Sequence, residues 1–190
     1  MTNERSAIEV FRARILFSNC LTTRQVEWHE AGHMLFWRAY YPNVKVKYGI
    51  RGDGYPCVSP VKPYAFVIDE LSPMEAAWVA ALKLGGIAAE AIMLNLANDC
   101  DAIAEWLSDD YVSETHRIDW EDDLDFGGDI SQVLFMLERK AGLDLVKPNF
   151  LNCMTAAVSM LNDNRDELER EANKAFRLFS EWRKNGKWHL

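Results

Sequence analysis

TTRQVEWHEAGHMLFWRAY, residues 22–40, is the stretch on which the fold depends. Thr22 with Gln25 three positions later has the spacing of a capping box, which predicts that a helix begins there. Apolar residues and two histidines then recur at helical spacing as far as Tyr40. Pro42 ends the helix, because the residue before a proline disfavours helical backbone. We therefore expect an amphipathic helix over about residues 22–40.

The centre of this helix, His29-Glu30-Ala31-Gly32-His33, matches the pattern H-E-x-x-H. Residues four apart share one face of a helix, so both imidazoles can bind one metal ion. Glu30 follows the first histidine and is placed to take a proton from a zinc-bound water. Two of the four histidines of the chain lie in the motif. The motif predicts Zn²⁺ as cofactor, His29 and His33 as ligands, and Glu30 as general base.

A third protein ligand is expected, because catalytic zinc sites combine three protein ligands with one open position. A histidine six residues after His33 would complete a longer known motif, but position 39 is alanine. The ligand must then be a carboxylate or a histidine further along the chain. Composition alone leaves seven candidates open: Glu90, His116, Asp119, Asp122, Asp123, Asp125 and Asp129.

Alternating apolar and polar residues over 44–48 predict a strand, and Arg51-Gly52-Asp53-Gly54 predicts a turn. Residues 55–61 and 64–68 are candidates for returning strands, although prolines interrupt them. An extended substrate would be able to add to the edge of the strand at 44–50. The sequence thus predicts a small β element close to the motif helix.

The rest of the chain is mainly helical in pattern. Ser72-Pro73-Met74-Glu75 has the signals of a helix start and is followed by a long apolar run. Gly85-Gly86 would weaken that helix and therefore needs a packing reason. The stretch from Asp99 to Asp129 is acidic, and we interpret its part from Trp106 to Phe126 as a solvated insertion, with a lid or partner surface as alternatives. Further helices are expected over about 7–17, 129–141, 149–161 and 165–184.

Composition limits the function classes. The 190 residues are 49% hydrophobic, enough for one domain over 1–190. A net charge of −8 disfavours nucleic-acid binding. The apolar run at 76–97 contains Lys83, Glu90 and Asn95, which indicates a core helix and not a membrane span. With no signal-peptide pattern, the four cysteines are expected to be free thiols, and the protein is expected to be cytoplasmic.

Four segments, in order, resemble the peptidase domain of the FtsH-type ATP-dependent zinc metalloproteases, over about residues 25–140. They are His-Glu-Ala-Gly-His at 29–33, the strand and turn at 44–52, Leu-Gly-Gly-Ile-Ala-Ala-Glu at 84–90, and Gly-Gly-Asp-Ile at 127–130. The resemblance implies His29, His33 and Asp129 as zinc ligands, Glu30 as base, and Glu90 as the residue that orients a histidine. A helix-surface position or a structural ion pair for Glu90 and a helix N-cap for Asp129 are the competing interpretations, and both roles can hold at once.

The chain also departs from this family. It contains no Gly-x-x-x-x-Gly-Lys-Thr loop, Ile87 stands where the family usually has arginine, and the separation between Glu90 and Asp129 is longer. Without an unfoldase, cleavage would be limited to peptides or unfolded protein segments, alone, as a homo-oligomer, or with a separate ATPase.

From these patterns we expect a mainly α (α+β) fold, a helical zincin-like peptidase domain with a small sheet or hairpin beside the motif helix. The expected function is a zinc-dependent metallopeptidase. The alternatives are a non-proteolytic metal-binding interaction protein on the same fold, a helical protein with a fortuitous motif, and a zinc hydrolase of another amide.

Overall fold

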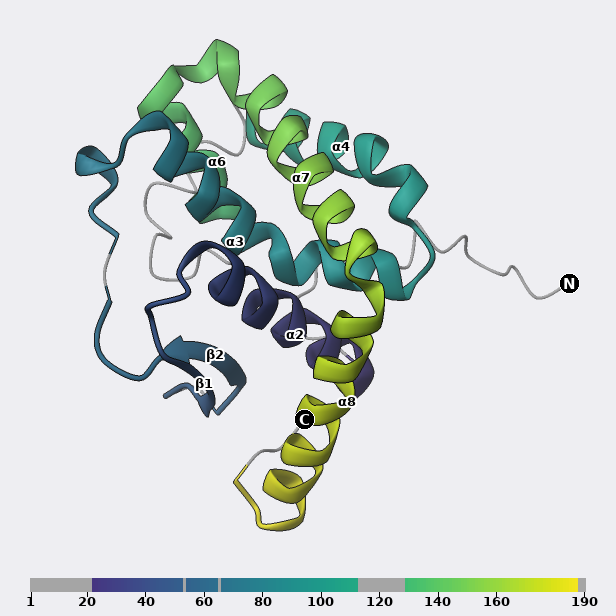
Figure 1. Ribbon diagram of the computed structural model, residues 1–190. Helices are drawn as coiled ribbons and strands as arrows, with labels where there is room; N and C mark the ends of the chain where they lie inside the picture. Colours follow the sequence, from purple (N-terminus) through teal and green to yellow (C-terminus); the bar gives the residue numbers. More distant parts are fainter. Residues whose placement is uncertain (1–21, 53, 65, 113–128, 188–190) are drawn as a thin grey trace, which may run out of the picture.

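The computed structural model describes residues 22–52, 54–64, 66–112 and 129–187. In this part of the chain the fold is mainly helical, with one two-stranded antiparallel sheet beside the motif helix (Figure 1). This confirms the mainly α class and the small β element. The helix expected over residues 7–17 lies outside the described residues.

Helix α2 (Thr23–Tyr40) carries the histidine motif and begins with the expected capping box. The backbone N–H of Gln25 donates to Thr22 Oγ1 over 3.3 Å, and Gln25 Oε1 accepts from the Thr22 N–H over 2.9 Å. Twelve residues of α2 are buried. The helix is covered on one side by α3 (Pro73–Met93) and on another by α8 (Arg165–Lys184). Its motif is therefore held by packing on several sides.

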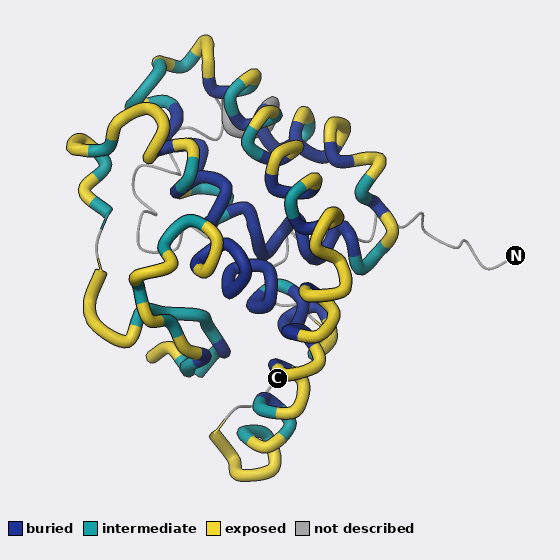
Figure 2. Tube along the Cα trace, viewed as in Figure 1, coloured by how far each residue is buried: buried dark blue, intermediate teal, exposed yellow. Residues whose placement is uncertain are grey.

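Helix α3 is the central element of the fold. It begins with the capping box of Ser72 and Glu75, as the sequence predicts. It lies between α2 on one side and α6 (Asp129–Ala141) and α7 (Val146–Asp163) on the other. Figure 2 shows α2 and α3 as the most continuously buried part of the trace. An apolar helix enclosed in this way is the core of the domain.

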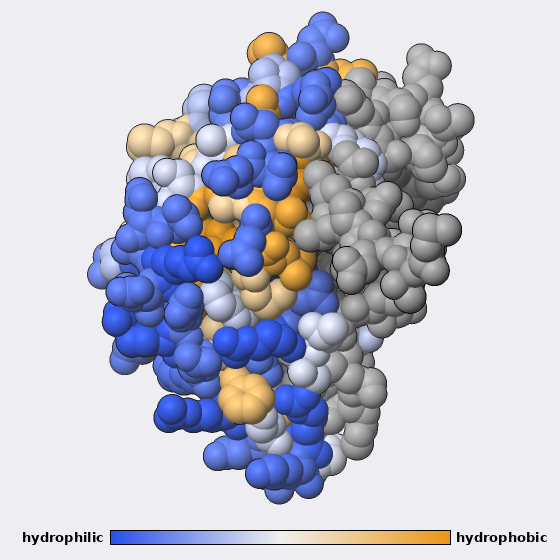
Figure 3. Space-filling view, turned by 90° about the vertical axis from the view of Figure 1, so that its right-hand side faces the viewer, coloured by the Kyte–Doolittle hydropathy of each residue, from blue (hydrophilic) through white to orange (hydrophobic). Residues whose placement is uncertain are grey.

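By length and composition, α3 is the one helix among the described residues that would be able to cross a membrane. Its most apolar window is 78% buried inside the fold, as expected of a core helix. On the face shown in Figure 3, most of the described surface is hydrophilic, around a small apolar area. The apolar composition of α3 is thus explained by the protein interior.

The glycines of α2 and α3 lie where the two helices cross. A Cβ added at Gly32 would overlap the backbone carbonyl of Gly85, and a Cβ at Gly85 would lie 2.5 Å from Cδ2 of Phe36. Only residues without a side chain permit so close a crossing. The crossing thus explains why Gly85 occurs in the middle of an apolar helix, where a glycine would otherwise only weaken the helix.

Helix α4 (Cys100–Val112) includes the beginning of the segment from Trp106 to Phe126, whose acidic composition predicts a solvated insertion. The helix packs against α7, and Leu107 is buried, so this first part is not solvated. The rest of that segment, residues 113–126, lies outside the described residues. Helix α7 begins at Val146, earlier than the predicted residue 149. Cys100 and Cys153 are free thiols, as expected.

Strands β1 (Val46–Ile50) and β2 (Pro56–Pro60) form a hairpin in which Tyr48 lies opposite Val58. The hydroxyl of Tyr48 donates to Glu171 Oε1 on α8 over 3.0 Å, and its ring meets that of Phe179 edge-on. Arg38 of α2 binds the other oxygen of Glu171 over 3.0 Å. One buried carboxylate therefore ties the hairpin, α2 and α8 together.

The returning strand proposed over 64–68 is wrong. Its described residues form no strand, and a 3₁₀ turn, η1 (Ile68–Glu70), follows. The rings of Tyr64 and Phe66 instead pack against Trp37 of α2, with centroids 5.8 Å away in each case. Ring packing against α2, and not strand pairing, holds this segment.

Replacing Gly32 with alanine should destabilise the protein. The added methyl would meet the Gly85 backbone, which has no rotamer by which to move away. We expect the free energy of unfolding, measured by urea titration with a chelator present, to fall by at least about 2 kcal/mol. Gly52→Ala is the matched control, because a Cβ there meets nothing within 4 Å. An unchanged or increased stability of Gly32→Ala would contradict the crossing described here.

Candidate metal centre

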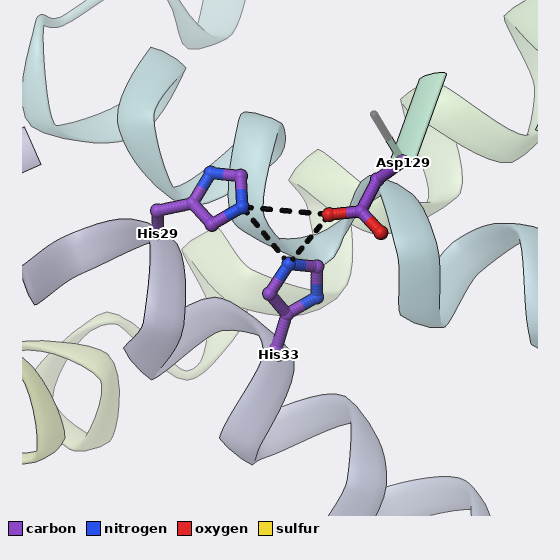
Figure 4. A group of neighbouring side chains, drawn as sticks. All are labelled: His29, His33 and Asp129. Atoms are coloured by element: carbon purple, nitrogen blue, oxygen red, sulfur yellow. Dashed lines mark hydrogen bonds and ion pairs between the residues drawn. The ribbon is translucent and has the colours of Figure 1, made fainter. Parts of the chain in front are cut away.

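Three side chains from two helices converge on one point (Figure 4). His29 and His33 come from successive turns of α2, and Asp129 is the first residue of α6. The two Nε2 atoms lie 3.0 Å apart, and Asp129 Oδ2 lies 3.1 Å from that of His33 and 3.5 Å from that of His29. These three are the described residues that form a potential metal-binding group.

The three separations fit a zinc ion. With zinc–ligand bonds of about 2.0–2.1 Å, the corners of a tetrahedron lie about 3.3 Å apart. The observed 3.0, 3.1 and 3.5 Å bracket that value. Two imidazoles and one carboxylate are also the ligand types that catalytic zinc sites use. The donor set would bind the ion and leave a fourth position open.

Both imidazoles are oriented through their other ring nitrogen. His33 Nδ1 lies 2.8 Å from the carbonyl of Leu82, which can only accept, so this nitrogen carries the proton. His29 Nδ1 lies 2.6 Å from Glu90 Oε1. In each ring Nε2 is therefore the nitrogen directed at the other donors. Glu90 is fully buried on α3, so it is not a helix-surface residue, and its contact with His29 fits both an orienting role and a structural ion pair.

The small size of Gly86 is what admits the His29 ring to this position. A Cβ at Gly86 would lie 2.5 Å from both Cε1 and Nε2 of His29. The second glycine of the pair on α3 thus serves the site, whereas Gly85 serves the helix crossing.

Asp129 is held by more than the histidines. Lys83 Nζ contacts Asp129 Oδ1 over 3.1 Å and leaves Oδ2 directed at the two imidazoles. Burial alone would raise the pKa of Asp129, but His33, His29 and Lys83 outweigh it and hold this pKa well below its usual range. Asp129 is therefore ionised at neutral pH. It is the first residue of α6, and its carboxylate contacts His29, His33 and Lys83.

The charge of the site also acts on His29. Burial lowers its pKa, but Asp129 and Glu90 outweigh this and raise the pKa of His29 to about 10. When no metal is bound, both ring nitrogens of His29 would therefore carry a proton at neutral pH. A metal ion must displace the proton on Nε2. The strongly negative surroundings that attract the proton would also attract a cation.

Glu30, which is buried, lies beside the three donors and is held by the hairpin. Its Oε2 accepts a hydrogen bond from the backbone N–H of Val58 in β2 over 2.7 Å. Burial raises the pKa of Glu30, against the opposing effects of His29 and His33. A carboxylate with a raised pKa is suited to both accepting and returning a proton near neutral pH.

The site opens into a pocket of about 370 Å³. One wall is aromatic, formed by Trp37, Tyr64 and Phe66, and β2 forms another. Of the described residues, none of β1 lines this pocket, and Val58 of β2 contacts Glu30. The expectation that the strand at 44–50 would offer its edge to the site is therefore wrong, because β2 lies between it and the pocket.

All five predicted site residues thus meet: His29, Glu30, His33, Glu90 and Asp129. Lys83 was not predicted as a site residue, and its charge within an apolar helix was the only signal for it. The Leu82 carbonyl and the Val58 N–H were not predicted either, because residue type carries no signal for a backbone contact. The remaining ligand candidates, His116, Asp119, Asp122, Asp123 and Asp125, lie outside the described residues.

No family model matches the chain, and no curated protein or solved structure matches it either.

The first prediction for the site concerns its metal content. Purified wild type loaded with zinc and freed of excess metal should hold about one zinc per chain by mass spectrometry. His33→Ala and Asp129→Ala should each lose it, because two ligands do not retain the ion. Asp99→Ala removes an exposed carboxylate elsewhere and should keep the zinc. Zinc retained by Asp129→Ala would show that another residue is the third ligand.

The second prediction concerns Glu90. Glu90→Gln keeps the shape of the side chain but removes the charge that orients and polarises His29. Zinc affinity, measured by competition with a chelating dye, should fall by about 10- to 100-fold. Glu167→Gln, on the exposed face of α8, is the control. Equal affinities for Glu90→Gln and wild type would reduce Glu90 to a packing role.

Proposed function

We propose that this protein is a zinc-dependent metallopeptidase. The observation that carries the proposal is the meeting of three metal-binding atoms and one further carboxylate in a single pocket. His29, His33 and Asp129 would supply the ligands (Figure 4), and Glu30 lines the same pocket. A purely structural histidine pair would not need this fourth group.

Zinc bound here would polarise a peptide carbonyl and lower the pKa of a water molecule to about 7. The protein groups supply the rest. Glu30 accepts the proton of the attacking water and returns it to the leaving nitrogen. Its Oε2 is engaged by Val58, so Oε1 is the atom that handles the proton. Lys83 keeps Asp129 in place throughout.

The resemblance to FtsH-type peptidases supports this proposal, because residues from three of its four segments, 29–33, 84–90 and 127–130, meet at the site. Gly85 and Gly86 let α3 approach α2, which brings Glu90 to His29. Asp129, which contacts His33, belongs to α6, far from α2 in the sequence. We therefore propose a helical zincin-like fold of that type, without a nucleotide-binding loop in these 190 residues.

The pocket favours a peptide with an apolar side chain next to the scissile bond. Trp37, Tyr64 and Phe66 form an aromatic wall that would bury such a side chain. A substrate can enter only through a segment that is extended or flexible, because the pocket lies between a helix and a hairpin. We propose peptides and unfolded protein segments as substrates.

Glu30→Gln tests the function directly. Zinc-loaded wild type should cleave a quenched-fluorescence library of flexible peptides, with preference for apolar residues. Glu30→Gln should retain its zinc and lose about 10²- to 10⁴-fold in kcat/KM, because the amide cannot accept the proton. Glu167→Gln is again the matched control for loss of one carboxylate.

Two other results would contradict the peptidase proposal. Wild type that binds zinc but cleaves no peptide in the library would favour the non-proteolytic metal-binding protein, or a hydrolase of another amide. Turnover that Glu30→Gln leaves unchanged would place the chemistry elsewhere or in a contaminant.

A further inference from the structure

The edge of β2 that faces away from β1 contains two prolines. The pairing with β1 is fixed by two backbone hydrogen bonds beside the strands: the Lys45 carbonyl accepts from the Val61 N–H, and the Tyr55 carbonyl accepts from the Arg51 N–H, both over 2.8 Å. These bonds and the register identify the residues of β2 that bond to β1, namely Cys57 and Ser59. Pro56, Val58 and Pro60 therefore direct their backbone groups away from β1.

Two of these three positions cannot donate a hydrogen bond, because proline has no N–H. Within β2, all of which the structure describes, Val58 is thus the only outward residue with a backbone donor. That donor is the one that binds Glu30 Oε2, over 2.7 Å. The prolines leave a single N–H at this edge, and it meets the carboxylate of the candidate base.

We propose that the Val58 backbone N–H is a positioning group for Glu30, which it holds with Oε1 toward the metal centre and the pocket. This inference rests on the proposed function, because it assigns Glu30 the part of the base. A glutamate side chain has three rotatable bonds, and fixing one of its oxygens removes most of that freedom. The hairpin itself is fixed to α8 through Tyr48 and Glu171, so the N–H is a rigid reference point.

Hydrogen exchange tests the contact without need of turnover. In zinc-loaded protein, the Val58 amide faces no strand and should be protected only by Glu30. Glu30→Ala should accelerate its exchange by about 10- to 100-fold, as expected for loss of a charge-assisted bond. The amide of Ser59, which bonds to β1, should be unaffected and reports on opening of the hairpin. Rapid exchange of Val58 in wild type, or equal rates in the two proteins, would overturn the proposal.

Val58→Pro tests the consequence for the reaction. It removes the donor and no bond to β1, and prolines already occupy the equivalent outward positions on either side. We expect kcat to fall by about 10- to 100-fold with KM and zinc content unchanged. Val58→Thr changes the side chain but keeps the N–H, so kcat should be lower in Val58→Pro than in Val58→Thr. A raised KM with unchanged kcat would mean that this N–H binds substrate instead and would overturn the proposal.

The two measurements separate this inference from the proposed function. If Val58→Pro fails to fold, the exchange rates decide. If wild type shows no turnover, the peptidase proposal fails and the positioning role fails with it, even where exchange confirms the contact. If wild type is active and the Val58 amide is unprotected, only the positioning role fails.

Discussion

The close crossing of α2 and α3 is the constraint on which the rest of the structure depends. Gly32 and Gly85 remove the side chains that would hold the two helix backbones apart. At that separation the Leu82 carbonyl of α3 reaches Nδ1 of His33, and the Glu90 carboxylate reaches Nδ1 of His29. A wider crossing would leave both imidazoles free to rotate. The fold and the metal centre therefore depend on the same contact.

Electrostatics at the site follow from this geometry. Glu90 and Asp129 draw a proton or a cation toward His29, and Lys83 compensates part of their charge. A buried group of this kind is costly unless each charge has a partner. A divalent cation between the imidazoles and Asp129 would replace the proton that His29 otherwise carries. The same charges would therefore favour either a proton or a cation at this position.

Much of the fold could be predicted because its signals are local. Capping boxes predicted the starts of α2 and α3, and the five-residue motif with its helical spacing predicted that two histidines and a glutamate lie together. Helix α4 was not predicted, because its few apolar residues are interspersed with acidic ones. The strand predicted over 64–68 was wrong, because aromatic side chains there pack against α2 instead of forming a strand pair. The bond from Val58 to Glu30 joins residues 28 apart through a backbone atom, so no residue type signals it.

We propose that one zinc ion binds between α2 and the start of α6. Anomalous scattering at the zinc edge, measured on crystals of the zinc-loaded protein, would locate the ion. We expect a single strong peak about 2.0–2.2 Å from Nε2 of His29, Nε2 of His33 and a carboxylate oxygen of Asp129. A peak bound by other residues, or none at this position in crystals that contain zinc, would contradict it.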